Sequence, residues 1–164
     1  MSTVDEQLAA LAERVQLLED REAIRDCINR YGFTADLGLV DEYADNFAPD
    51  GVYETELEGR GDIVGRDALR AFITAPGNPG SQHLSIDMMI RVDGDTAWAE
   101  GYSVTTLRQS EDTFKIHLAG YNHWDFVRVD GGWKIARRSR CTIGDRRDDV
   151  PRGRAIMSEF QAAL

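Results

Sequence analysis

The segment REAIRDCINRYGFTADLG, residues 21–38, predicts the first core element of the fold. Its apolar residues recur every three or four positions, which is the spacing of one buried stripe on an α-helix. The stripe consists of Ile24, Cys27, Ile28, Tyr31 and Ala35. Gly38 is a favourable residue just past a helix C-terminus, so we expect the helix to end there. Asp36 then lies in the last turn, where the helix dipole disfavours a negative charge by about 0.3–1 kcal/mol. A carboxylate at this position is either a solvated helix end or part of a functional site.

The residues before this segment carry a second apolar stripe. Its members alternate spacings of three and four, which predicts another amphipathic helix. They are Leu8, Leu11, Val15 and Leu18. Because the two stripes are out of phase, we expect a break or bend near Glu19–Asp20. Residues 1–18 would form an arm that lies on the body of the protein or on a neighbouring subunit.

Downstream of Gly38, helical patterns give way to extended ones. Residues 40–51, VDEYADNFAPDG, predict a short helix with Asp41 as N-cap, closed by Pro49, Asp50 and Gly51. A strand at 52–59 and a short helix beginning near Asp67 follow. The remaining predicted elements are a Gly/Pro-rich loop at 75–82, strands at 82–92, 96–109, 115–129 and 133–143, and a C-terminal helix within 152–164. Helices followed by antiparallel hairpins indicate an α+β fold with helices on one face of a curved sheet.

Composition limits the function. The chain has 164 residues with 42% hydrophobic content, which suits one folded domain of residues 1–164, including the 1–18 arm and a 143–164 tail. The formal net charge of −10 argues against nucleic acid or an anionic membrane as the main partner. The N-terminus lacks a signal-peptide core, and no stretch approaches ~20 apolar residues. We therefore expect a cytoplasmic protein without membrane association.

Four motifs together carry a resemblance to a known family. They are EAIRDCINRYGFTADLGLVDEYADNFAPDGVYE at 22–54, GRDALRAF at 65–72, VDGDTAWAEGY at 92–102 and GYNHWDFVRVDGGWKIARR at 120–138. The order of these motifs resembles the SnoaL-like branch of the NTF2-like superfamily over roughly residues 17–142. This resemblance implies a cone-shaped, curved antiparallel sheet that, with N-terminal helices, encloses one mostly apolar pocket.

Within the superfamily, the sequence is most similar to the scytalone dehydratase and bile-acid 7α-dehydratase group. The resemblance implies an Asp–His catalytic pair, with Asp36 ending the first core helix and His83 opening a strand. Tyr31 matches a pocket tyrosine of the bile-acid enzyme, and Asn122 matches a pocket asparagine of scytalone dehydratase. Two family positions differ: a second pocket histidine falls near Arg108 and Gln109, and an extra acid falls near Thr106.

The Asp–His pair has a clear chemical rationale. Neutral imidazole is a base suited to removing a proton from carbon near neutral pH. A carboxylate on the other ring nitrogen fixes the tautomer and stabilises the imidazolium that forms. Such a partner would also offset the unfavourable position of Asp36 at its helix end.

Strand alternation places His83 unfavourably. Five apolar residues of the 82–92 strand share the face opposite His83; they are Leu84, Ile86, Met88, Ile90 and Val92. Either a bulge or a sheet covered on both faces would resolve the conflict. The family resemblance favours the second explanation, with neighbouring subunits on the outer face.

The same alternation predicts the lining of the pocket. On the 115–129 strand, Asn122 shares a face with Trp124 and Phe126, and Tyr53 is a further candidate. These residues would bind substrate. His117 and His123 share the opposite face and are interpreted as surface or interface histidines. No HxH or HExxH spacing supports a metal site. Arg137, Arg138 and Arg140 read as surface charges by default, although one could hold an anionic leaving group.

These features predict a cofactor-independent lyase. His83 would act as base or acid, Asp36 would orient it, and Tyr31 would bind a substrate oxygen. The substrate would be small, hydrophobic and cyclic, aromatic-like or steroid-like. An isomerase using the same proton transfer is the nearest alternative, and a non-catalytic binding protein or accessory subunit is another. We expect a homo-oligomer, trimer or dimer, and the 75–82 loop as a candidate lid.

Overall fold

The computed structural model describes residues 3–54, 61–74 and 81–142. The described elements follow the predicted order of helices first and hairpins second. They are α1 (Val4–Asp36), α2 (Val40–Asp45), β1 (Phe47–Tyr53), β2 (Ile63–Val64), α3 (Arg66–Ile73), β3 (Ser81–Asp93), β4 (Thr96–Arg108), β5 (Phe114–Val129) and β6 (Gly132–Thr142). The predicted C-terminal helix, most of the candidate lid and most of the 52–59 strand lie outside the described residues.

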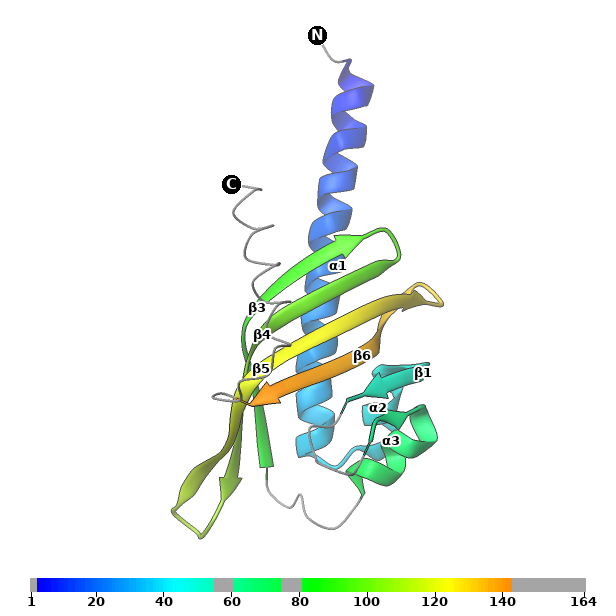
Figure 1. Cartoon of the computed structure of the whole chain (residues 1–164). Helices are drawn as coiled ribbons and strands as arrows, with labels where there is room; N and C mark the ends of the chain where they lie inside the picture. Colours follow the sequence, from blue (N-terminus) through cyan, green and yellow to red (C-terminus); the bar gives the residue numbers. More distant parts are fainter. Residues whose placement is uncertain (1–2, 55–60, 75–80, 143–164) are drawn as a thin grey trace.

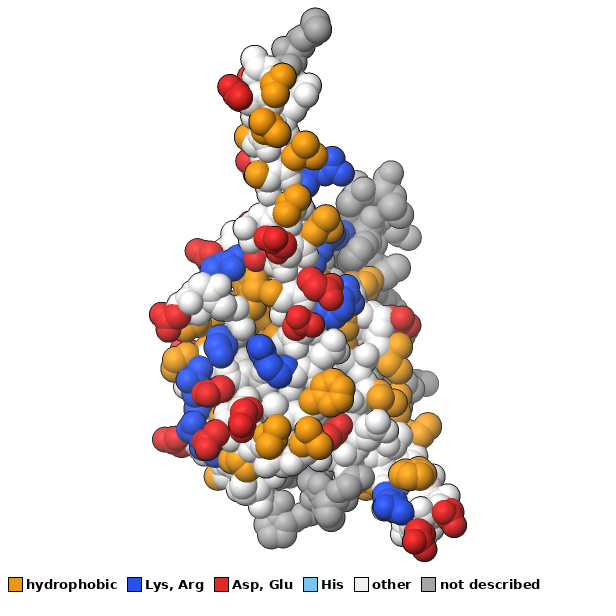
Figure 2. Space-filling view, turned by 180° about the vertical axis from the view of Figure 1, so that it is seen from behind, with side chains coloured by type: hydrophobic (Ala, Val, Ile, Leu, Met, Phe, Trp, Pro, Cys, Tyr) orange, Lys and Arg blue, Asp and Glu red, His pale blue; other side chains and the backbone are white. Residues whose placement is uncertain are grey.

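Helix α1 is continuous, so the predicted bend near Glu19–Asp20 is wrong. A capping box between Thr3 and Glu6 begins the helix. Residues 3–19 are all exposed, and this half of the helix extends beyond the sheet with apolar side chains on its surface (Figures 1 and 2). The out-of-phase stripes reflect two environments along one straight helix, since only the second stripe contacts the core.

Asp20 marks the point where α1 enters the body of the protein. Its buried carboxylate accepts hydrogen bonds from Arg128 at 2.8 Å and from the Trp133 indole at 3.0 Å. Burial opposes ionisation of Asp20, but these donors outweigh it and hold the pKa of the carboxyl below its usual value. Asp20 thereby fixes α1 to β5 and β6.

The other end of α1 closes with the predicted glycine. Gly38 has a φ of 67°, and the N–H groups of Gly38 and Leu39 donate to the carbonyls of Ala35 and Thr34. This is the Schellman arrangement, which satisfies the last carbonyls of the helix. It turns the chain sharply into α2.

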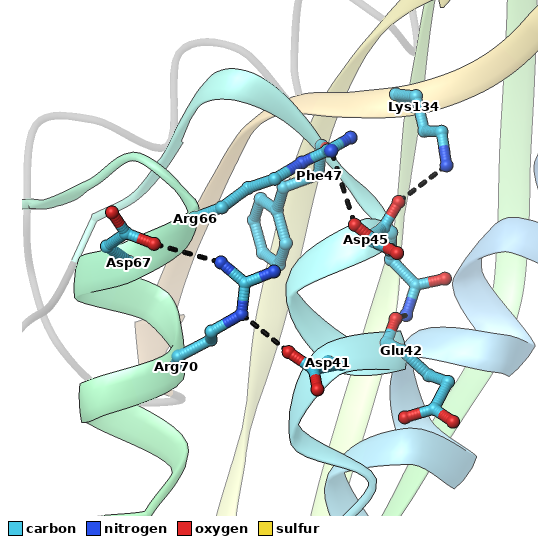
Figure 3. A network of polar contacts seen from close by, with 9 residues as sticks. Asp41, Glu42, Asp45, Phe47, Arg66, Asp67, Arg70 and Lys134 are labelled. Atoms are coloured by element: carbon cyan, nitrogen blue, oxygen red, sulfur yellow. Dashed lines mark hydrogen bonds and ion pairs between the residues drawn. The ribbon is translucent and has the colours of Figure 1, made fainter.

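Helix α2 is shorter than predicted and Asp41 is not its N-cap. Leu39 occupies that position without a side-chain cap, and Asp41 instead pairs with Arg70 of α3 at 2.7 Å (Figure 3). Arg66 pairs with Asp45 at 3.2 Å, which adds a second link between α3 and α2. The segment predicted to close the helix, Pro49–Gly51, is part of strand β1.

The six strands form one open sheet in the order β2-β1-β6-β5-β4-β3. All neighbouring pairs are antiparallel except β1 and β6, which are parallel. Helix α1 crosses one face of this curved sheet, and α2 and α3 lie beside β1 (Figure 1). No described helix combines the length and apolar composition that crossing a membrane requires.

The core lies between α1 and the sheet face that it covers. It contains the second stripe of α1 and inward-facing residues of β4, β5 and β6. The largest fully buried side chains are Trp124, Tyr43, Phe47, Phe126 and Ile24. The predicted stripe is therefore confirmed as core: Ile24, Cys27, Ile28 and Tyr31 are buried, and Ala35 is partly buried and packs against them.

Strand β3 contains a β-bulge, which resolves the conflict over His83. Its pairing with β4 shifts between Ile86 and Met89, so that Asp87 and Met88 together oppose Gly101. Asp87 adopts a φ of 53°. Because of the extra residue, even-numbered side chains before and after the bulge point to opposite faces of the sheet. Leu84 and Ile86 are 41% and 39% exposed, whereas Ile90 is 5% exposed. The prediction of one apolar face along the whole strand is wrong, and His83 lies on the face toward α1.

Gly101 makes this bulge sterically feasible. A Cβ at this position would lie 2.7 Å from the Ile86 carbonyl oxygen and 2.7 Å from the Met88 sulfur. We expect Gly101→Ala to lower the free energy of unfolding by about 1–3 kcal/mol, since it overpacks this contact. Urea unfolding measures the change.

Gly132→Ala is the matched control. The nearest atom to a Cβ at Gly132 is 3.7 Å away, so the added methyl group meets an ordinary contact. Equal stability of the two variants would contradict the assigned role of Gly101.

Candidate functional site

Asp36 and His83 are in direct contact. The Asp36 carboxylate at the end of α1 lies 2.6 Å from Nδ1 of the His83 ring. The same carboxylate accepts the backbone N–H of His83, at 3.1 Å to Oδ1 and 2.9 Å to Oδ2. One carboxylate therefore holds both the backbone and the ring of His83. Because an ionised carboxylate only accepts, Nδ1 carries the proton and Nε2 keeps a lone pair.

The surroundings of His83 favour its neutral form. Burial is the main cause that lowers the pKa of the imidazole, and the positive charges of Arg138 and Arg140 add to it. The hydrogen bond to Asp36 acts in the opposite direction but does not prevail. A neutral imidazole with a free Nε2 lone pair has the properties of a general base.

Tyr31 lies next to this pair. Its ring and the His83 ring are 6.3 Å apart, edge to face. Its hydroxyl receives a hydrogen bond from Nη1 of Arg138 at 2.6 Å and one from Tyr43 at 3.4 Å. Burial raises the pKa of the Tyr31 hydroxyl, with Arg138 opposing this shift. Tyr31 is thus a protonated phenol beside the imidazole.

Arg138 was predicted to be a surface charge but belongs to the site. Its side chain is buried, with the residue 4% exposed, so the default reading as surface charge is wrong. The guanidinium carbon lies 4.7, 4.8 and 4.9 Å from the ring centroids of Tyr31, Tyr53 and Trp124. Such contacts stabilise a cation through the aromatic quadrupole.

A second bulge explains this misplacement. Phe126 pairs with Ile135 and Asp125 pairs with Arg137, so Ala136 has no partner on β5. Strict alternation from Ile135 would have turned Arg137 inward, but the extra residue turns Arg138 inward instead. No signal in the sequence alone marks this register shift.

The structure places the predicted pocket residues on the same inward face. Asn122 and Trp124 are 1% exposed and Phe126 is 2% exposed. Tyr53 on β1 is 7% exposed and contacts Phe72 of α3. Oδ1 of Asn122 accepts from Nε of Arg138 at 3.1 Å, whereas its Nδ2 is buried with no hydrogen-bond partner in the described structure. Asn122 therefore joins the network of Arg138 and Tyr31.

The other two histidines lie elsewhere. His117 is exposed, and His123 is on the outer face of the sheet between Glu100 at 2.7 Å and Asp125 at 3.0 Å. Within residues 3–54, 61–74 and 81–142, no three His, Cys, Asp or Glu side chains gather as a metal site requires. A cavity of about 380 Å³ lies nearer the β3–β4 turn and includes Phe126 but not Asp36 or His83 on its wall.

Comparison with known proteins identifies the class. The model of the SnoaL-like domain matches residues 16–139, most of the chain. An NTF2-like protein with a cystatin-like fold from Novosphingobium aromaticivorans is 35% identical, with a TM-score of 0.76 over 87% of this chain and 93% of that one. The fold is therefore that of the NTF2-like proteins. The chain belongs to the SnoaL-like family.

Two further solved structures show the same fold. A protein of unknown function from Mycobacterium tuberculosis, determined as an aspartate-to-asparagine variant, is 29% identical, with a TM-score of 0.70 over 82% of this chain and 81% of that one. A candidate scytalone dehydratase from Novosphingobium aromaticivorans is 24% identical, with a TM-score of 0.66 over 76% and 85%. No curated protein matches this chain.

His123 provides a test of the outer-face electrostatics. Burial lowers its pKa, but the hydrogen bonds to Asp125 and Glu100 outweigh this and raise it to about 9. The folded state thus binds the proton more tightly than the unfolded chain, whose pKa is near 6.5. The contribution of His123 to the free energy of unfolding should be largest below pH 6.5 and should be lost as the pH rises through about 9.

Urea unfolding of the wild type and of His123→Gln across this range measures the effect. The variant should lose this fall in stability, and His117→Gln, at an exposed histidine, should retain it. An unchanged pH dependence in His123→Gln would contradict the assignment.

Proposed function

We propose that this protein is a cofactor-independent lyase that removes a proton from carbon and eliminates water from a small cyclic, aromatic-like or steroid-like substrate. The observation that carries the proposal is the 2.6 Å contact of the Asp36 carboxylate with Nδ1 of His83. This contact leaves Nε2 as the basic atom of a neutral imidazole. The likeness in fold to a candidate scytalone dehydratase is consistent with this reaction class.

The proposed reaction assigns one role to each residue. Nε2 of His83 takes the proton from a substrate carbon, and the electron pair of that C–H bond forms the new C=C bond. The hydroxyl on the adjacent carbon leaves with its bonding pair and takes a proton from the imidazolium, so water is released. Asp36 orients the ring and stabilises its positive charge. Tyr31 and Asn122 bind the substrate oxygen.

Two other functions use parts of the same site. An isomerase would return the proton from His83 to a different carbon instead of releasing water. A binding protein would hold the ligand against Trp124, Phe126 and Tyr53 without proton transfer. The elimination is favoured over binding alone because Asp36 holds a partly buried imidazole with a free Nε2 lone pair, which apolar binding does not require.

Proton exchange tests the role of His83. Cyclic ketones, steroids and phenolic polyketides are first screened for binding by thermal shift. The bound compounds are then followed by NMR in D2O for loss of C–H protons or of water. His83→Ala should slow exchange or elimination by about 10²–10⁴-fold while binding persists, because a general base contributes about this much.

His117→Ala is the matched control, since it removes an exposed histidine outside the site. It should retain the wild-type rate. Equal rates for His83→Ala and the wild type would reject His83 as the base. Binding with no exchange by the wild type would favour the binding protein.

The pH profile provides an independent check. Because the pKa of His83 lies below 6.5, its neutral form persists at pH 7 and is lost only when the pH falls below 6.5. kcat/KM should be flat at neutral pH and should decline about tenfold per pH unit below the folded-state pKa. An acid limb beginning well above pH 6.5 would contradict the role of His83 as a neutral base.

A further inference from the structure

The exposed half of α1, residues 4–19, carries a row of apolar side chains that no other described residue covers (Figure 2). The members of this row are between 52% and 71% exposed; they are Val4, Leu8, Leu11, Val15 and Leu18. Helices in proteins owe most of their stability to the packing of an apolar face. An uncovered apolar row on a long helical segment therefore marks an interaction surface.

The spacing of the row is that of a coiled coil. From Val4 to Leu18 it advances by four, three, four and three residues. This is a heptad repeat with Leu8 and Val15 at position a and the other three residues at position d. Among the remaining side chains, Leu17 is the one further leucine, is less exposed at 37%, and lies outside the row. An apolar stripe restricted to a and d is the narrow seam of paired helices.

This seam points away from the body of the protein. Nine residues separate Leu11 from Asp20, and nine separate Val15 from Ile24. At about 3.6 residues per turn, nine residues make about two and a half turns, so the members of each pair lie on opposite sides of α1. Asp20 and Ile24 are buried against the sheet side. A second helix can therefore reach the seam from the side that the sheet does not occupy.

The seam ends where α1 enters the body. The next two heptad positions after Leu18 are Glu22 and Arg25, which form an ion pair with each other at 3.5 Å on the surface. At the other end, the capping box of Thr3 and Glu6 closes the helix. A free peptide of this length would be marginally helical because nucleation is costly. Here the segment continues a helix that is fixed to the sheet, so this cost is met before any pairing.

Charges beside the seam specify the direction of a partner helix. Arg14 occupies position g and Glu19 occupies position e. In a parallel pair, g contacts the e position five residues later on the other helix, so Arg14 of each copy meets Glu19 of the other. In an antiparallel pair, g faces g and e faces e. Here the g residues are Gln7, Arg14 and Arg21, and the e residues are Asp5, Ala12 and Glu19. An antiparallel pair would thus offer no opposite charges.

We propose that a second copy of this chain docks on the exposed half of α1 and forms a parallel two-stranded coiled coil over Val4–Leu18. The two bodies then lie on opposite sides of the seam. Val15 at position a between leucines at position d is a combination that favours two strands. Asp36 lies roughly 27 Å further along the helix than Leu18, at 1.5 Å per residue, so the dimer leaves the Asp36–His83 pair outside the interface. The inference is independent of the proposed function.

Sedimentation and light scattering of the full chain test the association. The wild type should be a dimer at micromolar concentration. Leu11→Glu would bury two facing carboxylates in the seam and should raise the dissociation constant of the dimer at least about 100-fold. Ala10→Glu is the matched control, since it adds the same charge at an exposed residue outside the seam. A monomeric wild type, or a dimer that Leu11→Glu leaves unchanged, would overturn the proposal.

Charge reversal tests the parallel direction. Arg14→Glu should weaken the dimer about tenfold, because the reversed charge meets Glu19 of the other copy twice in each dimer. The double variant Arg14→Glu/Glu19→Arg should restore the affinity, since it exchanges the two signs and keeps each pair opposite. A double variant as weak as Arg14→Glu alone would reject the parallel pairing.

Disulfide formation tests the contact itself. In a parallel pair each d residue faces its own counterpart, and a disulfide requires a Cα separation of about 4.4–6.8 Å. Mild oxidation of Leu11→Cys should therefore give a covalent dimer. Glu13→Cys, on the opposite side of the helix, is the control, and the wild type accounts for the native cysteines, of which Cys27 is buried. If residues 143–164 or the body of another copy cover the seam instead, Leu11→Cys forms no covalent dimer, and the proposal fails.

Discussion

The contact between the Asp36 carboxylate and His83 is the interaction on which the site depends. It joins the last residue of α1 to the start of β3 through both the backbone N–H and the ring of His83. A carboxylate at a helix C-terminus is opposed by the helix dipole, and two N–H donors of His83, one from the backbone and one from the ring, offset that cost. The same contacts fix the tautomer of His83. Asp36, whose position at the helix end is unfavourable by itself, thereby orients the imidazole of His83.

The histidines on the two faces of the sheet have pKa values shifted in opposite directions. On the face toward α1, burial and the charge of Arg138 lower the pKa of His83, so that the imidazole stays neutral. On the outer face, Glu100 and Asp125 raise the pKa of His123 to about 9, so that it stays cationic near neutral pH. The difference arises from the neighbouring charges, since both side chains are partly buried. Only the inner histidine has the properties of a base.

The fold by itself leaves the activity open, because one architecture hosts many unrelated functions. Membership of the SnoaL-like family establishes the α+β sheet with its N-terminal helix. The site is formed by side chains that converge from separate elements: Tyr31 and Asp36 from α1, His83 from β3, Asn122 from β5 and Arg138 from β6. Aromatic packing around Arg138 holds a positive charge within the protein interior.

The sequence by itself determined the element order, the core stripe of α1, the glycine that ends it and the hairpin strands, because periodicity and capping are local properties. It also singled out Asp36, His83 and Tyr31 through the family motifs. It did not determine which way His83 and Arg138 face. Those directions depend on bulges opposite Gly101 and at Ala136. At each bulge one extra residue turns the side chains that follow it to the other face of the sheet. It also implied a bend in α1 that is absent, since a change of stripe can equally mark where a straight helix leaves the core. Only the tertiary structure decided these points, because bulges and burial arise from pairing and packing with segments distant in the chain.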